Sequence, residues 1–161
     1  MPLKLPIDNP MDDGLLTLAS ETAGLGRRNS PLKRRAVSTA YYAVFHAVAK
    51  LCADELLPGA DRGSEEFEKA YRALEHSSLK RAAQNFAPSQ SRLREIGNLI
   101  AELQSERHKS DYLPIERHSY SVRKCSELID SARIAMQKLR ELDASERRIL
   151  VVALIFKNRS Q

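Results

Sequence analysis

The stretch from Pro31 to Leu57 constrains the fold more than any other part of the chain. Ser30 and Pro31 form a typical helix start, and Pro58 with Gly59 cannot continue a helix. Two apolar stripes recur at helical spacing, and the second is made of small side chains. A helix that is apolar over so much of its circumference needs cover on more than one side, so we predict the central helix of a bundle. The stripes are Val37, Tyr41, Val44, Val48 and Leu51, and Ala36, Ala40, Ala43, Ala47 and Ala53.

The composition points to one helical, cytoplasmic protein. A chain of 161 residues is long enough for a proper core, and its six Gly, absent Trp and lack of period-two patterns favour an all-α fold. Cys52 and Cys125 fall inside predicted helices without metal-ligand spacing, which indicates reduced, buried thiols. The amino terminus has no secretory pattern, and no run approaches the ~20 apolar residues of a membrane span. We therefore expect no membrane, no metal and no cofactor.

The chain divides into three predicted segments. Residues 1–11 look like an extended lead-in, residues 12–142 an antiparallel bundle of four to five helices, and residues 143–161 an apolar carboxyl-terminal helix. Asp143 and Glu146 fit a capping box at the start of this last helix. The run from Ile149 to Phe156 is apolar on every helical face, so either the bundle covers it completely or a partner chain does. Both alternatives stay open at this point.

Local signals set the other helix boundaries within the bundle. The first helix should run from Asp12 or Asp13 to Leu25, and Ser64 should cap a later one. We predict a break or kink at His76-Ser77-Ser78. Two further expectations concern residue 114: Pro114 should end the helix that contains Leu93 to Leu103, and the last long helix should begin near Pro114 or Glu116, with Tyr120 and Val122 on its buried side.

Five basic residues lie within nine positions around the start of the central helix, without one acid among them. A helix amino terminus disfavours cations by roughly 0.3–1 kcal/mol each, and a bound phosphate would relieve that cost. The cluster therefore suggests a nucleotide or RNA partner, in keeping with a net charge of +5. The simpler and commoner interpretation is a solvated basic loop that pairs with carboxylates elsewhere. The five residues are Arg27, Arg28, Lys33, Arg34 and Arg35.

The central helix also carries a family resemblance. The run RRAVSTAYYAVFHAVAKL resembles the signature helix of small bacterial HEPN proteins (higher eukaryotes and prokaryotes nucleotide-binding domain). His76 before an apolar helix ending at Phe86, and the run from Arg107 to Tyr112, fit the same pattern, so the similarity covers roughly Leu15 to Leu142. The resemblance implies an antiparallel bundle, a homodimer, and a cleft in which Tyr42, His46 and His76 bind a ligand.

The Arg107 region is where the resemblance implies chemistry. Active HEPN ribonucleases need no metal and place a histidine after an arginine with four to six intervening residues; the arginine stabilises phosphate charge while the histidine moves a proton. Here that window holds Tyr112, Leu113 and Pro114, so a ribonuclease would use Arg107 with Asp111, Tyr112 or a nearby histidine in place of the missing base. A structural clamp is the alternative: Arg107 pairs with Asp111 at i and i+4, and Tyr112 fixes the Pro114 turn.

These observations leave three functional hypotheses. The first is a HEPN-like binding module that engages a nucleotide, RNA or a minimal nucleotidyltransferase partner, within a toxin–antitoxin or defence system. The second is a divergent metal-independent ribonuclease. The third is an oligomeric interaction protein without a nucleic-acid ligand, assembled through the apolar carboxyl-terminal helix. We favour the first, because the family motifs and the basic cluster agree while the ribonuclease histidine is missing.

Overall fold

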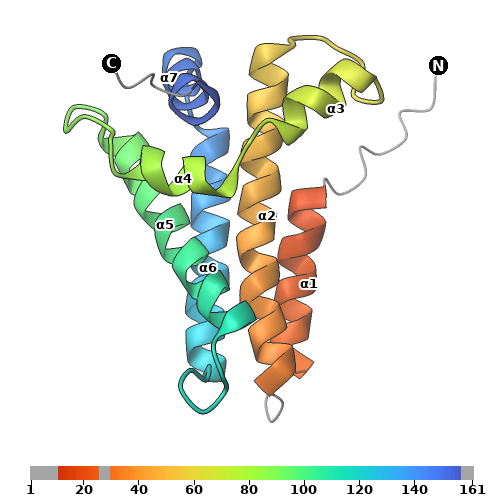
Figure 1. Ribbon diagram of the computed structural model, residues 1–161, viewed down its shortest axis with the longest axis vertical. Helices are drawn as coiled ribbons and strands as arrows, with labels where there is room; N and C mark the ends of the chain where they lie inside the picture. Colours follow the sequence, from red (N-terminus) through yellow and green to blue (C-terminus); the bar gives the residue numbers. More distant parts are fainter. Residues whose placement is uncertain (1–10, 26–29, 157–161) are drawn as a thin grey trace. The chain divides into compact units, whose positions relative to one another are not determined.

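The computed structural model describes residues 11–25 and 30–156, and every regular element in those ranges is an α-helix (Figure 1). The predicted all-α class and the long helix that begins at Ser30 are confirmed. Residues 1–10 of the predicted lead-in lie outside the described ranges, and Met11 already belongs to the first helix. The helices are α1 (Met11–Leu25), α2 (Ser30–Leu56), α3 (Glu65–Arg72), α4 (His76–Ala83), α5 (Ser91–Tyr112), α6 (Val122–Arg140) and α7 (Ala144–Ile155).

The chain forms two compact units, and three of its helices contribute to both. The first unit comprises Met1–His46 and Leu103–Arg133, and the second comprises Ala47–Glu102 and Ile134–Gln161. Helices α2, α5 and α6 are therefore divided between the units, and each supplies one segment to the first unit and another to the second. None of the helices in the described ranges combines the length and apolar character that a membrane crossing requires.

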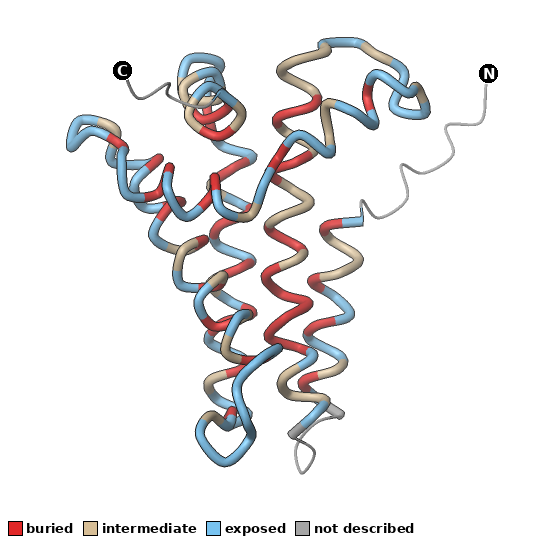
Figure 2. The backbone as a smooth tube through the Cα atoms, viewed as in Figure 1, coloured by how far each residue is buried: buried red, intermediate tan, exposed pale blue. Residues whose placement is uncertain are grey.

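The first unit is a four-segment helical bundle. Helix α1, the start of α2, the end of α5 and the start of α6 run alternately up and down (Figure 1), and α2 is continuously buried from Ala36 to Tyr41 (Figure 2). The members of both predicted stripes that lie in this unit are buried, and the small side chains allow neighbouring helices to approach closely. Fully buried members of this core are Ala19, Ala36, Val37, Ala40, Tyr41, Ala43, Val44, Leu103, Cys125, Leu128 and Ala132. The later members of both stripes belong to the second unit, where Val48 and Ala53 are buried but Ala47 and Leu51 are only half-buried.

The second unit brings helices α4 and α5 into backbone contact. Gly97 on α5 is buried, and a Cβ atom placed there would lie 2.8 Å from the Cα of Ala83 on α4. The predicted cap of α3 is confirmed, because the Ser64 hydroxyl accepts a hydrogen bond from the N–H of Phe67. The predicted break is displaced: the interruption lies between Arg72 and His76, and His76-Ser77-Ser78 form the first turn of α4.

Helix α7 is partly covered within the second unit. Its predicted capping box is present: the Asp143 carboxylate accepts from the N–H of Glu146, and the Glu146 side chain accepts from the N–H of Asp143. The helix packs against α4 and buries Leu150 and Leu154, while Val152 remains 56% exposed. Ordinary packing thus accounts for one face of the apolar run, and a partner for the other face stays a prediction.

The predicted start of the last long helix is wrong. Helix α6 begins at Val122, because the N–H groups of Arg117 and His118 both donate to the Pro114 carbonyl and close a separate turn. Ser121 then caps α6, since its Oγ accepts from the N–H of Lys124 at 3.0 Å. Val122 is exposed, contrary to our expectation. Tyr120 is buried as expected, although it precedes the helix.

We predict opposite effects for two glycine-to-alanine substitutions. Gly97→Ala should lower the free energy of unfolding by about 1–3 kcal/mol, because its methyl group collides with the Ala83 backbone. Gly14→Ala in α1 meets no atom within 4 Å and should raise it by about 0.5–1 kcal/mol through helix propensity. Urea unfolding measures both. A Gly97→Ala protein as stable as the wild type would contradict the close contact.

Candidate functional site

Arg34 holds the carboxyl-terminal end of α5 and the turn that follows it. Its Nε donates to the Ser110 carbonyl at 2.8 Å, and its Nη1 donates to the His118 carbonyl at 3.0 Å. Its Nη2 donates to the carbonyls of Lys109, at 3.3 Å, and Leu113. All these acceptors are main-chain oxygens, and those at the last turn of a helix have no partners within it. Arg34 therefore acts as a helix cap supplied by another helix.

This contact explains a cation in the first turn of α2. Arg34 is poorly placed with respect to the dipole of its own helix but well placed with respect to the negative end of α5. The carbonyl oxygens therefore stabilise the positive charge of Arg34 without a bound phosphate. For this one member of the basic cluster, partners within the protein are therefore present, although they are carbonyls and not the carboxylates we expected.

A buried polar network supports the same end of α5. The Tyr120 hydroxyl lies 2.9 Å from the Glu106 carbonyl oxygen and 3.1 Å from Glu106 Oε2, and Lys109 Nζ donates to Oε1 at 2.8 Å. His118 Nε2 is 3.4 Å from Oε2. Burial raises the pKa of Glu106, but the hydrogen bonds from Lys109 and Tyr120 outweigh it and leave the pKa below its usual 4.5. The carboxylate is therefore ionised at neutral pH.

Arg107 follows Glu106 on α5, and its side chain lies among tyrosine rings. Its Nε is 2.9 Å from Asp111 Oδ2, so the predicted i, i+4 ion pair is confirmed, and its Nη2 donates to the Tyr42 hydroxyl at 2.8 Å. The guanidinium carbon lies 5.4 Å from the ring centroid of Tyr42 and 5.8 Å from those of Tyr41 and Tyr112. Such contacts stabilise the charged guanidinium.

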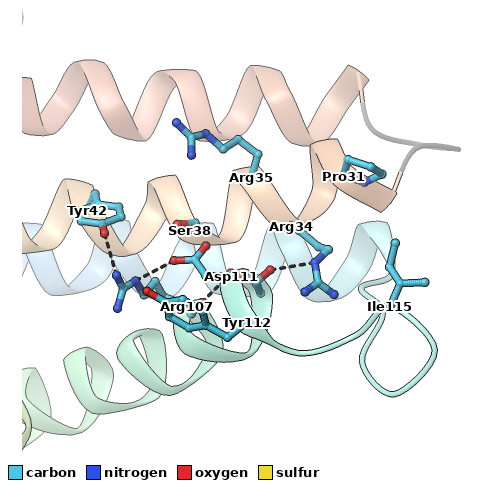
Figure 3. A pocket seen from close by; sticks show the side chains of 10 residues that line it. Pro31, Arg34, Arg35, Ser38, Tyr42, Arg107, Asp111, Tyr112 and Ile115 are labelled. Atoms are coloured by element: carbon cyan, nitrogen blue, oxygen red, sulfur yellow. Dashed lines mark hydrogen bonds and ion pairs between the residues drawn. The ribbon is translucent and has the colours of Figure 1, made fainter.

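A pocket of about 690 Å³ opens beside this cluster, entirely within the first unit (Figure 3). Helix α2 supplies one wall and the end of α5 the other. Arg107, Asp111 and Tyr112 gather between α2 and the end of α5, whereas the Arg35 side chain extends from α2 toward α1, away from that group. The volume falls within the range of small-molecule sites. The lining residues are Pro31, Arg34, Arg35, Ser38, Tyr42, Arg107, Ser110, Asp111, Tyr112 and Ile115.

The pocket unites most of the predicted site residues, from three separate predictions. It brings together Arg34 and Arg35 of the basic cluster, Tyr42 of the implied cleft, and all three residues of the implied catalytic set, Arg107, Asp111 and Tyr112. These residues lie far apart in the sequence. Their convergence follows because α2 and α5 run antiparallel, so the start of one helix meets the end of the other.

Other predicted site residues lie elsewhere or outside the described ranges. His46 and His76 do not line the pocket: His46 packs edge-on against Phe45 in the first unit, and His76 begins α4 in the second. The Lys33 side chain is also absent from the lining, and the Lys33 carbonyl instead lies 3.7 Å from Cys125 Sγ. Arg27 and Arg28 lie outside the described ranges.

One detail of the clamp hypothesis is wrong. Tyr112 is 65% exposed, and the turn at Pro114 is held by Arg34 through the Leu113 and His118 carbonyls. A cap supplied by a distant helix cannot be predicted from the local sequence, because the residues near Pro114 give no indication that the Arg34 side chain contacts them. The ring of Tyr112 is therefore available at the pocket rim.

The helical spacing of residues on α2 could have predicted further residues that line the pocket. Pro31, Arg35, Ser38 and Tyr42 recur at positions i, i+4, i+7 and i+11, which is one face of a helix. Ser38 was overlooked because its small polar side chain interrupts an otherwise apolar helix. A polar stripe beside the two apolar stripes would have indicated a face of α2 that contacts something other than the core.

The chemistry of the pocket suits anion binding. Its lining carries three arginines against one carboxylate, that of Asp111, among the described residues. Burial lowers the pKa of Arg107, but the Tyr42 hydrogen bond and nearby groups outweigh it and raise that pKa, so the guanidinium is permanently charged. No histidine lines the pocket in the described ranges, nor do those ranges hold a group of three or more His, Cys, Asp or Glu side chains able to bind a metal ion.

Comparisons with protein-family models, with curated proteins and with solved structures give no match to this chain. The HEPN resemblance therefore rests on the sequence motifs alone.

We predict that Arg34 and Arg35 differ sharply in their effect on stability. Arg34→Gln should lower the free energy of unfolding by about 2–3 kcal/mol, because it strands carbonyls that a charged donor satisfies. Arg35→Gln, the adjacent exposed residue, should change it by no more than about 0.5 kcal/mol. Chemical unfolding of the two variants measures both free energies, and an equal loss of stability in Arg34→Gln and Arg35→Gln would contradict the proposed cap.

We predict a pH-dependent stability that involves His46. Burial lowers its pKa below the usual 6.5, against a smaller opposing effect of Asp12. Because the unfolded chain then binds the proton more readily, stability should fall as the pH decreases through 6.5. His46→Gln should flatten this part of the profile. Thermal unfolding of both proteins at pH 7.5 and 5.5 tests it, and parallel profiles would show that His46 plays no part.

Proposed function

We propose that the chain is a HEPN-like binding module whose first unit binds RNA or a nucleotide through the pocket between α2 and α5. The observation that carries the proposal is that Arg35 of α2 and Arg107 of α5 both line one pocket, with the Arg35 side chain extended toward α1 and Arg107 beside Asp111 and Tyr112 (Figure 3). Arginine pairs with phosphate oxygens through charge-assisted hydrogen bonds, so two arginines from different helices suit a phosphate-bearing chain.

The state of each arginine supports this assignment. Arg35 is exposed, and Arg107 is mostly shielded, with its side chain 16% exposed. Arg107 uses Nε and Nη2 for Asp111 and Tyr42, while its Nη1 has no hydrogen-bond partner among the residues that the structure describes. Tyrosine rings hold the guanidinium in place, so little side-chain entropy is lost when Nη1 binds a phosphate oxygen.

Binding fits the pocket better than cleavage does. A metal-independent ribonuclease needs a group that accepts the proton of the attacking hydroxyl. Asp111, the carboxylate in the lining, is already paired with Arg107, and a tyrosine hydroxyl is a poor base at neutral pH. We accordingly propose a module that engages RNA or a nucleotide, with a nucleotidyltransferase-type partner and a toxin–antitoxin or defence setting as the context that the resemblance implies.

We predict salt-sensitive binding of single-stranded RNA that depends on both arginines. Arg35→Gln and Arg107→Gln should each weaken binding and lower the slope of log affinity against log salt by about 0.7, the contribution of one phosphate contact on a single strand. Fluorescence anisotropy with a labelled oligoribonucleotide in chelator-containing buffer measures affinity, and gel analysis of the same samples reports any cleavage.

Arg94→Gln provides the matched control, because Arg94 is exposed on α5 but does not line the pocket. It should leave affinity and slope at wild-type values. Arg107→Gln removes two internal contacts, so its thermal unfolding must be recorded, whereas Arg35→Gln disturbs none that the structure shows. Absence of RNA and nucleotide binding by the wild type, or wild-type binding by both pocket variants, would refute the proposal.

A further inference from the structure

Tyr112 is an exposed aromatic ring at the edge of the candidate phosphate site. It is the last residue of α5 and lines the pocket, with 65% of its surface exposed. The His108 ring, one helical turn earlier, lies 5.0 Å away, and the Arg107 guanidinium carbon lies 5.8 Å from the ring centroid. Tyr112 lies beside Arg107 at the pocket (Figure 3), and most of its surface remains exposed.

These groups offer one partner for each of the two chemical parts of a nucleotide. An exposed ring beside a fixed cation offers a stacking surface for a base and an adjacent donor for its phosphate. Arg107 and Tyr112 both line the pocket from α5 and lie side by side (Figure 3). A phosphate-bearing ligand without an aromatic group would leave the Tyr112 ring unused.

We infer that the pocket takes an unpaired nucleotide, with its base stacked on Tyr112 and its phosphate against Arg107. This inference rests on the proposed function and narrows it to single strands and free nucleotides. In a duplex both faces of each internal base are covered by neighbouring bases, so a ring on the protein surface has no free face to contact. Stacking also predicts little dependence on base identity, because every base presents an aromatic face.

The test compares Tyr112→Ala with Tyr112→Phe by anisotropy. The probes are a labelled single-stranded oligoribonucleotide, the same strand in a duplex, and an abasic strand of equal length. Wild type should bind the single strand more tightly than the other two. Tyr112→Ala should weaken single-strand binding by roughly 5- to 150-fold, the loss measured when one stacking aromatic is removed. Tyr112→Phe, which keeps the ring face, should bind as the wild type does.

Two controls separate stacking from other effects. Tyr112→Ala should bind the abasic strand as the wild type does, because phosphate contacts remain. Phe156→Ala removes an exposed aromatic residue from the second unit and should leave all affinities unchanged. Salt-sensitive binding that Tyr112→Ala does not weaken, or equal affinity for duplex and single strand, would overturn this inference and leave the proposed function standing. No binding of any probe by wild type would refute both.

Discussion

A single guanidinium fixes the end of the first unit where the candidate site lies. Arg34 binds main-chain carbonyls of Lys109, Ser110, Leu113 and His118, so the start of α2, the end of α5 and the following turn share one anchor. The pocket draws its walls from these same segments. The geometry of the pocket therefore depends on the Arg34 contacts, which form within the protein and need no bound ligand. A site that is already formed in this way loses less entropy when a ligand binds.

Helix α5 serves the core and the pocket with successive residues. Glu106 and Ser110 are buried, the first in a network with Tyr120, while Arg107 and Asp111 line the pocket, to which Ser110 also contributes. A helical period of 3.6 residues places the two i, i+4 pairs on adjacent faces of the same turn. Glu106 and the Ser110 carbonyl hold the end of the helix through Tyr120 and Arg34, and Arg107 carries the positive charge that a phosphate would meet.

The helices were predictable where a local signal decides them. The Ser64 cap, the Asp143–Glu146 capping box and the Arg107–Asp111 pair all follow from residues within four positions of each other, and each end of α2 follows from a local signal of its own. The start of α6 was missed because Pro114 is a good first helical residue. The carbonyl contacts of Arg34 and the Pro114 turn are what delay the helix, and they depend on a side chain some eighty positions away.

The same distinction applies to the candidate site. Charge selected Arg35 as a candidate and the family resemblance selected Tyr42 and Arg107, but no spacing in the chain could show that they share a pocket. That follows only from the antiparallel arrangement of two helices. His46 was drawn into the implied cleft by its position in a motif, yet its ring packs on Phe45. Periodicity locates a face, whereas contacts between distant segments decide what that face meets.

The two cysteines give each unit its own internal reporter. Cys125 belongs to the first unit and Cys52 to the second, and both are completely buried. Burial raises the pKa of Cys52 to about 12 and also raises that of Cys125, so at neutral pH neither supplies the thiolate that reacts with alkylating reagents. Each thiol becomes reactive only when its surroundings open. The alkylation rates of Cys52 and Cys125 thus report, in one native molecule, how often each unit opens locally.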